Sequence, residues 1–221
     1  MTIIQAKDKQ IIADHLKNLD RPVKIINFTQ ELECQYCRET RQLMEELARM
    51  SEKLSIEVYN FQIDKDRVEQ YKIDKIPATV IEGEKDYGVR FYGIPAGYEF
   101  VGLLEGIIAV SKGQSGLNEK TRQILKNITK PVHFQVFVTP TCPYCPSAVR
   151  LAHAFAIENE HITADMVEIT EFPHLGNRYG VRGVPKTVIN ENISLEGAVP
   201  EYKLIEELNR ALGNKTQDRE E

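Results

Sequence analysis

Apolar and polar positions along the first half of the chain follow two periods, and each period predicts one type of element. Apolar residues three or four positions apart predict helices over residues 8–19, 38–54, 66–71 and 98–111. Short β-prone runs predict strands over residues 23–28, 55–63, 79–81 and 89–92. The last two strands flank residues 82–88, which have a hairpin signature. The order is helix, strand, helix, strand, helix, strand, strand, helix, which is typical of an α/β unit.

The same pattern begins again after residues 112–116, the largest small and polar break in the chain. Leu-Lys-Asn-Leu-Asp-Arg-Pro-Val at residues 16–23 reappears as Leu-Lys-Asn-Ile-Thr-Lys-Pro-Val at residues 125–132. The second half predicts strands over residues 132–138, 166–169, 187–189 and 193–195, helices over residues 148–157, 173–179 and 202–212, and a polar tail over residues 213–221. We therefore predict two domains, residues 1–113 and residues 114–221.

Composition narrows the class of protein. The net charge is −5 and no cluster of Lys and Arg stands out, which argues against binding to nucleic acid. Charged residues interrupt the N-terminal segment too early for a signal peptide, and no apolar run is long enough to span a membrane. We therefore expect a cytoplasmic protein without a membrane partner. A charged fraction of 28% with no Trp is compatible with a thermophilic source.

All four cysteines lie in two C-x-x-C motifs, Cys34-Gln35-Tyr36-Cys37 and Cys142-Pro143-Tyr144-Cys145. Each motif ends an apolar run and begins a helical pattern. Backbone N–H groups and the positive end of the helix dipole favour thiolate over thiol at the first cysteine, Cys34 or Cys142. The second cysteine, Cys37 or Cys145, lies one helical turn on and can resolve a mixed disulfide. The spacing predicts two reversible dithiol switches that need no dissociable cofactor.

A proline follows each motif at the same distance. Pro77 and Pro185 both stand 43 positions after the first cysteine, in the settings Lys-Ile-Pro-Ala-Thr and Gly-Val-Pro-Lys-Thr. Cysteine pairs and prolines therefore share one offset of 108 residues between the two halves. A loop proline alone carries little meaning, but repetition at one distance from a cysteine pair favours a role at the same site.

These motifs and their tandem arrangement are similar to those of known protein families. Each half resembles thioredoxins and glutaredoxins, and C-P-Y-C is the glutaredoxin form of the motif. The whole chain resembles the two-domain, glutaredoxin-like protein disulfide oxidoreductases of hyperthermophiles. The resemblance implies two tandem thioredoxin-like folds, each with a mixed central sheet flanked by helices. It also implies that both prolines are cis and lie against the cysteine pairs, with backbone groups of Ile76 and Val184 placed to bind a substrate strand.

The same resemblance implies an activity. We expect a thiol–disulfide oxidoreductase acting on protein disulfides and dithiols, with reductase, oxidase and isomerase capacity. A thioredoxin-reductase-type flavoenzyme or low-molecular-weight thiols would supply its electrons. We also expect the C-P-Y-C site to be the more active one, because Pro143 and Pro146 restrict its backbone.

Several alternatives stay open. A dedicated electron donor to a peroxidase would carry the same residues. The four cysteines could instead hold structural zinc, but zinc ribbons keep their pairs roughly 15–20 residues apart. An iron–sulfur cluster shared between two molecules and purely structural disulfides are further alternatives. Two complete α/β units around the two pairs favour redox chemistry over all of these.

One element of the thioredoxin pattern is missing. Thioredoxins carry a buried acid six positions before the first cysteine, where it helps to deprotonate the resolving thiol. Here those positions hold Phe28 and Val136. Glu57 and Glu168, on the second predicted strand of each half, are the candidates to replace it.

Overall fold

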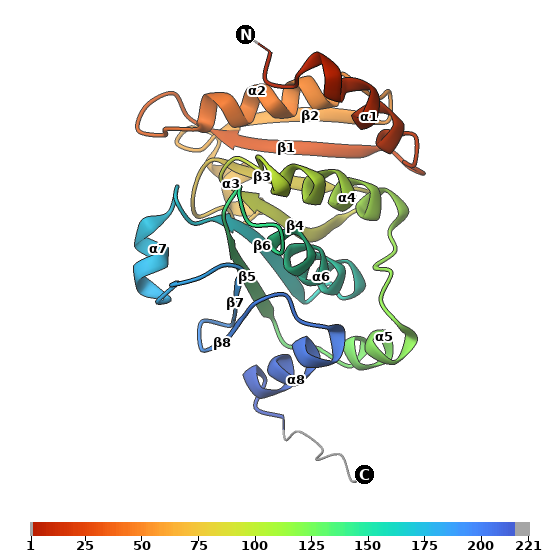
Figure 1. The fold of residues 1–221 in the computed structure, drawn as a ribbon, viewed down its shortest axis with the longest axis vertical. Helices are drawn as coiled ribbons and strands as arrows, with labels where there is room; N and C mark the ends of the chain where they lie inside the picture. Colours follow the sequence, from red (N-terminus) through yellow and green to blue (C-terminus); the bar gives the residue numbers. More distant parts are fainter. Residues whose placement is uncertain (1, 215–221) are drawn as a thin grey trace.

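The structure is a computed structural model that describes residues 2–214 (Figure 1). The predicted polar tail lies outside the described residues except for residues 213 and 214. The first repeat contains α1 (Ala6–Leu16), β1 (Val23–Thr29), α2 (Cys37–Ala48), β2 (Leu54–Asn60), α3 (Lys65–Gln70), β3 (Ala78–Glu82), β4 (Asp86–Tyr92) and α4 (Tyr98–Lys112). The second repeat contains α5 (Glu119–Lys126), β5 (Val132–Val138), α6 (Cys145–Glu158), β6 (Ile162–Glu168), α7 (Pro173–Arg178), β7 (Lys186–Ile189), β8 (Ile193–Glu196) and α8 (Glu201–Ala211).

Each repeat has the predicted fold. Strand β1 pairs parallel with β2 and antiparallel with β3, and β3 pairs antiparallel with β4. In the second repeat, β5 pairs parallel with β6 and antiparallel with β7, and β7 pairs antiparallel with β8. A β-α-β unit followed by a helix and an antiparallel hairpin is the thioredoxin arrangement. The predicted α/β class and element order are confirmed.

The two repeats share one sheet, which the sequence patterns do not indicate. Strand β4 pairs parallel with β6, so the order across the molecule is β2-β1-β3-β4-β6-β5-β7-β8. Gly88 permits this approach, because it has a φ of 78° and an added Cβ would lie 2.6 Å from the Ile162 carbonyl oxygen. The repeats are therefore joined through backbone hydrogen bonds as well as through the linker.

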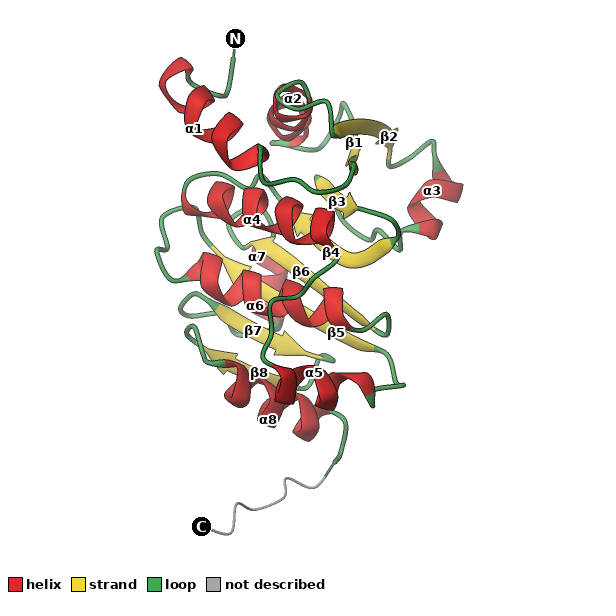
Figure 2. Ribbon diagram, turned by 90° about the vertical axis from the view of Figure 1, so that its right-hand side faces the viewer, coloured by secondary structure: helices red, strands yellow, loops and turns green. Residues whose placement is uncertain are grey.

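More helices cover one face of the sheet than the other (Figure 2). One continuous core runs beneath α1, α2, α4, α5, α6 and α8 and draws residues from both repeats. A smaller core on the opposite face packs against α3 and α7. Among the described helices, none has the length and apolar character needed to cross a bilayer.

Several predicted boundaries were wrong, and two of them have a clear physical reason. The helix expected over residues 38–54 ends at Ala48, and Leu54 begins β2 because it pairs with Val23 of β1. The strand expected over residues 166–169 begins at Ile162 and ends at Glu168. Its start is concealed in the sequence by Asp165, a charged residue that is buried because the His133 ring nitrogen lies 2.6 Å from its carboxylate.

Candidate active site

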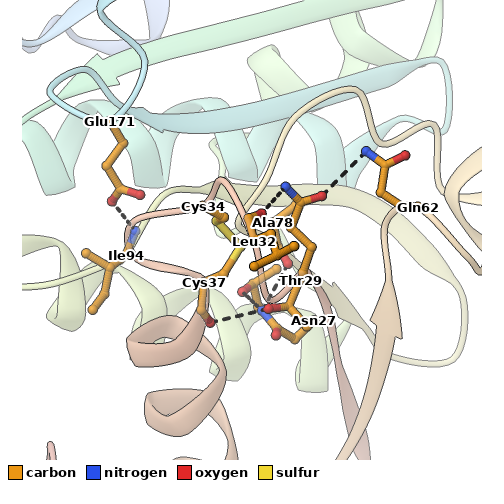
Figure 3. The surroundings of a disulfide bond; sticks show 11 residues. Asn27, Thr29, Leu32, Cys34, Cys37, Gln62, Ala78, Ile94 and Glu171 are labelled. Carbon is orange, nitrogen blue, oxygen red and sulfur yellow. Dashed lines mark hydrogen bonds between the residues drawn. A yellow bond between two sulfur atoms is a disulfide. The ribbon is translucent and has the colours of Figure 1, made fainter.

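The first cysteine pair lies at the start of α2 and forms a disulfide (Figure 3). Cys37 is the first residue of the helix and is only 1% exposed, whereas Cys34 precedes the helix and is half-buried. The Thr29 hydroxyl lies 3.4 Å from the Cys37 carbonyl oxygen and ties this turn to the end of β1. Cys34 is therefore the sulfur of the pair that solvent and substrates can reach.

The second pair repeats this geometry at the start of α6. Cys142 and Cys145 form a disulfide, and Cys145 is the first residue of the helix with no exposed surface. Cys142 is 7% exposed, less than Cys34, and its Sγ lies 3.8 Å from the Val184 carbonyl oxygen. Pro146 lies in the first turn of the helix, where its missing N–H leaves no hydrogen bond unmade.

Both proline loops contain the cis peptide bond that the resemblance implied. The Ile76–Pro77 and Val184–Pro185 peptide bonds are both cis. The Gly93 N–H donates to the Pro77 carbonyl at 2.9 Å, and the Gly197 N–H donates to the Pro185 carbonyl at 2.8 Å. At the second site the loop and the pair are in contact through Val184 and Cys142. At the first site, Figure 3 draws Ala78, which follows Pro77, beside the disulfide.

The strand positions that hold an acid in thioredoxins are apolar and fully buried here, with Phe28 at 0% and Val136 at 1% exposure. The two candidates on the second strands are engaged elsewhere. Glu57 accepts a hydrogen bond from the Tyr59 hydroxyl at 2.7 Å and lies 3.1 Å from the Lys24 ammonium. Glu168 is buried and accepts hydrogen bonds from the hydroxyl and N–H of Thr170. The structure favours neither as a proton acceptor.

A different carboxyl group lies beside the second site. Glu99, in the first turn of α4, is 1% exposed, and within residues 2–214 neither of its carboxyl oxygens has a hydrogen-bond partner. Burial raises the pKa of Glu99 to about 8. A Cβ at Gly102 would lie 3.7 Å from Glu99 Oε2 and 3.8 Å from Pro146 Cβ, so the carboxyl group and the residue that follows Cys145 both adjoin Gly102.

Sequence reasoning missed Glu99 because it belongs to the first repeat and lies at a site of the second. Helix α4 packs against α6, and this contact brings the two together. A signal was present in the sequence, since Glu99 stands at helical spacing from Leu103 and Gly106 on the buried face of α4. A charge on a buried helical face is costly unless it is paired or neutral.

The described residues give no support for the alternative in which the four cysteines bind a metal ion. Within the described part of the chain, no group of three or more His, Cys, Asp and Glu side chains is arranged to hold a metal ion. The two cysteine pairs open separate helices in separate repeats, and each is closed on itself as a disulfide.

Comparison with known proteins agrees with this geometry. Residues 22–105 and 132–210 each match the thioredoxin domain family. A protein disulfide oxidoreductase from Aeropyrum pernix K1 is similar in structure, with a TM-score of 0.90 and 31% identity over 96% of this chain and 95% of that chain. The alkylhydroperoxide reductase component AhpF from Enterococcus faecalis has the same fold, with a TM-score of 0.85 and 24% identity over 93% of this chain and 99% of that chain.

Curated relatives are longer proteins. The F component of the alkyl hydroperoxide reductase of Staphylococcus aureus is 27% identical over 153 residues, which cover 69% of this chain and 28% of the relative. An NADH dehydrogenase of Bacillus subtilis is 28% identical over 148 residues, or 67% of this chain and 27% of the relative. This chain thus spans about a quarter of these relatives. With a family match in both repeats and a full-length structural relative, the chain belongs to the thioredoxin domain family, among the tandem-domain protein disulfide oxidoreductases.

Proposed function

We propose that this protein is a thiol–disulfide oxidoreductase that exchanges electrons with protein disulfides and dithiols at both cysteine pairs. One observation carries the proposal: each pair opens a helix with its first cysteine outermost, next to a cis-proline loop. We further propose residues 1–113 and 114–221 as the two domains, with one site in each.

Reduction of a substrate disulfide would proceed in two exchanges. The thiolate of Cys34 or Cys142 attacks one substrate sulfur, forms a mixed disulfide and releases the other substrate sulfur as a thiolate. Cys37 or Cys145 then loses its proton and attacks the mixed disulfide, which releases the second substrate thiolate and leaves a disulfide in the protein. Two electrons pass to the substrate, and its two thiolates take up two protons.

Glu99 is the candidate proton acceptor at the second site. Its carboxyl group and the first turn of α6 both adjoin Gly102, and a pKa of about 8 is close to the ordinary value for a thiol, about 8.5. Proton exchange between groups of matched pKa has a small free-energy change in either direction. We propose that Glu99 takes the proton of Cys145 during resolution and returns it when the disulfide is reduced again.

The cis-proline loops are the proposed docking edges. Backbone groups of Ile76 and Val184 would pair with an extended segment of a substrate protein, which places its sulfur near Cys34 or Cys142. The 3.8 Å contact between Cys142 and the Val184 carbonyl supports this at the second site. Recognition through the backbone makes few demands on substrate side chains.

A second candidate function is electron donation to a peroxidase. The similarity to the AhpF component of alkyl hydroperoxide reductases favours it. A thioredoxin-reductase-type flavoenzyme is the proposed electron source in both cases, and a cytoplasmic location remains a prediction. A coupled assay with peroxide, a peroxidase and this protein would separate the two: a dedicated donor turns over peroxide rapidly and general protein disulfides poorly.

The experiment that tests the main proposal is dithiothreitol-driven reduction of insulin by the wild type, by Cys34→Ser and by Cys142→Ser. We expect the wild type to turn over and Cys142→Ser to remove most of the rate. Equal losses from the two changes would contradict the leading role of the second site. An inert wild type would overturn the proposed function.

A further inference from the structure

Glu171 of the second repeat reaches into the first repeat. It lies in the loop between β6 and α7, and its Oε1 accepts a hydrogen bond from the Ile94 N–H at 2.6 Å. Figure 3 shows this carboxylate and Ile94 in the surroundings of the Cys34–Cys37 disulfide. A carboxylate from one repeat is therefore part of the environment of the other repeat's site.

The backbone that Glu171 holds is joined to the cis-proline loop. Gly93, directly before Ile94, donates its N–H to the Pro77 carbonyl at 2.9 Å. Gly93 has a φ of 87°, and an added Cβ would lie 2.8 Å from Glu171 Oε1 and 2.7 Å from Glu168 Cβ. Because Gly93 has no side chain, the Glu171 carboxylate can occupy this space. A shift of Ile94 would be passed to Pro77 through the single hydrogen bond made by Gly93.

The surroundings of Glu171 make its charge sensitive to pH. Burial and the nearby Glu168 raise the pKa of Glu171 to about 7, although the Ile94 hydrogen bond acts in the opposite direction. Glu168, the last residue of β6, is the charged neighbour of Glu171 in its own repeat, and the disulfide of the first site belongs to the first repeat. Near neutral pH the carboxyl group that accepts the Ile94 hydrogen bond therefore changes charge.

The second site lacks this arrangement. The residue equivalent to Ile94 is Ala198, which follows Gly197 and its hydrogen bond to Pro185. Among the described residues, no carboxylate accepts a hydrogen bond from the Ala198 N–H. The contact made by Glu171 is thus particular to the first site, so the two sites should respond differently to pH.

We propose that Glu171 is a positioning residue for the Cys34–Cys37 site, which acts through the Ile94 amide beside the cis-proline loop and couples the redox equilibrium of that site to pH. The inference rests on the proposed function. An ionised Glu171 opposes a thiolate at Cys34 and so favours the disulfide, whereas a neutral Glu171 does not. The first site should become more strongly reducing as Glu171 ionises.

The test is the equilibrium of the first site with glutathione from pH 5.5 to 9, in the full chain with Cys142→Ser and Cys145→Ser. Two glutathione thiols reduce the protein disulfide and become one glutathione disulfide, so two electrons and two protons balance. Against this background, Glu171→Gln should raise the equilibrium constant for reduction about tenfold at pH 8.5, which is about 30 mV. Below pH 6 the two proteins should have the same equilibrium constant, because residue 171 is then uncharged in both.

Three further variants make the test specific. Glu158→Gln in the same background removes a carboxylate that pairs with Arg122 at the far end of α6, and it should leave the curve of the first site unchanged. Glu171→Gln combined with Cys34→Ser and Cys37→Ser should leave the second site unchanged. Glu171→Asp keeps the charge and should keep the pH-dependent change of slope near pH 7, which provides a test even if the glutamine variant folds poorly.

Two outcomes would overturn the proposal. One is a Glu171→Gln curve that coincides with the parent curve at every pH. The other is a displacement that is equal at every pH, since that is the result of a structural role without charge coupling. Failure of both cysteine pairs to exchange with glutathione in the parent protein would instead overturn the proposed function.

Discussion

At the scale of single residues, two carboxyl groups with raised pKa values stand out, the buried Glu99 and the half-buried Glu171. Glu99 belongs to the first repeat and adjoins Gly102, as Pro146 of the second site does, whereas Glu171 belongs to the second repeat and accepts a hydrogen bond from Ile94 of the first. Burial raises the pKa of both, to about 8 and about 7. Each repeat therefore contributes an acid to the site of the other.

Changing Glu99 to Gln should slow the resolving step at the second site. With Cys34 and Cys37 both changed to Ser, we expect the lifetime of the mixed disulfide on Cys142 to rise about tenfold or more, since a positioned proton acceptor typically contributes at least that much. Acid-quenched samples analysed by mass spectrometry measure the trapped species. An unchanged lifetime at pH 8.5, where Glu99 is mostly ionised, would exclude Glu99 as the acceptor for Cys145.

The same substitution should change the pH dependence of stability. The folded protein keeps the Glu99 proton up to about pH 8, whereas the unfolded chain releases it near the ordinary value of 4.5. The free energy of unfolding therefore falls as pH rises between these values, and Glu99→Gln abolishes this fall. Relative to the wild type, the variant should gain on the order of a few kcal/mol at pH 9 and nothing at pH 4. Urea unfolding of the oxidised proteins at both pH values tests this, and an equal difference at both would contradict it.

At the scale of elements, the segment from β4 to α4 connects the two sites. Its Gly93 end contacts the first proline loop and Glu171, and its other end contacts the loop before Cys142 through a hydrogen bond of 3.0 Å from the Tyr98 N–H to the Pro140 carbonyl. Gly97 precedes Tyr98 with a φ of 60°, and an added Cβ would overlap the Pro140 carbonyl oxygen. This close approach requires glycine.

Changing Gly97 to Ala should lower the free energy of unfolding by about 2–3 kcal/mol or more, because backbone strain and overlap with Pro140 add together. Gly116→Ala is the matched control. Gly116 has a φ of 70° and no neighbour within 4 Å of an added Cβ, so its change should cost only about 1 kcal/mol. Chemical denaturation of both variants measures the difference, and equal losses would show that the contact with Pro140 is unimportant.

At the scale of the whole molecule, the shared sheet makes the two repeats one structural unit. Besides the β4–β6 pairing, Asp165 of β6 lies 3.9 Å from the ammonium of Lys75, which lies 3.7 Å from the ring centroid of Tyr92. Lys75 directly precedes the Ile76–Pro77 bond, so a further contact joins the first proline loop to the second repeat. On the opposite face, α4 packs on α6.

Residues 1–113 produced alone should therefore self-associate. Separation leaves β4 as an edge strand and uncovers the apolar face of α4 that packs on α6, and both features favour association. Size-exclusion chromatography with light scattering should show dimers or larger species for the fragment, beside a discrete species for the full chain. A stable monomeric fragment would show that the shared sheet contributes little to the first repeat.

Local patterns in the amino-acid sequence were enough to predict the tandem α/β order, the two cysteine pairs and the two proline loops. These features follow from short-range spacing and from one repeat offset, and none of them depends on which distant elements meet. Several element boundaries were not predicted. The start of β6 was missed because the polarity of Asp165 concealed it and its half-buried partner His133 is 32 positions away.

How the two halves complete each other depends instead on tertiary packing. The joining of β4 to β6, the position of Glu99 and Pro146 next to Gly102 and the reach of Glu171 to Ile94 all require contacts between segments far apart in the chain. Edge strands carry no sequence mark of the partner they will bind, and a buried acid on a helix does not reveal which site it faces. The cysteine chemistry thus follows from local motifs, whereas packing places the acids beside it.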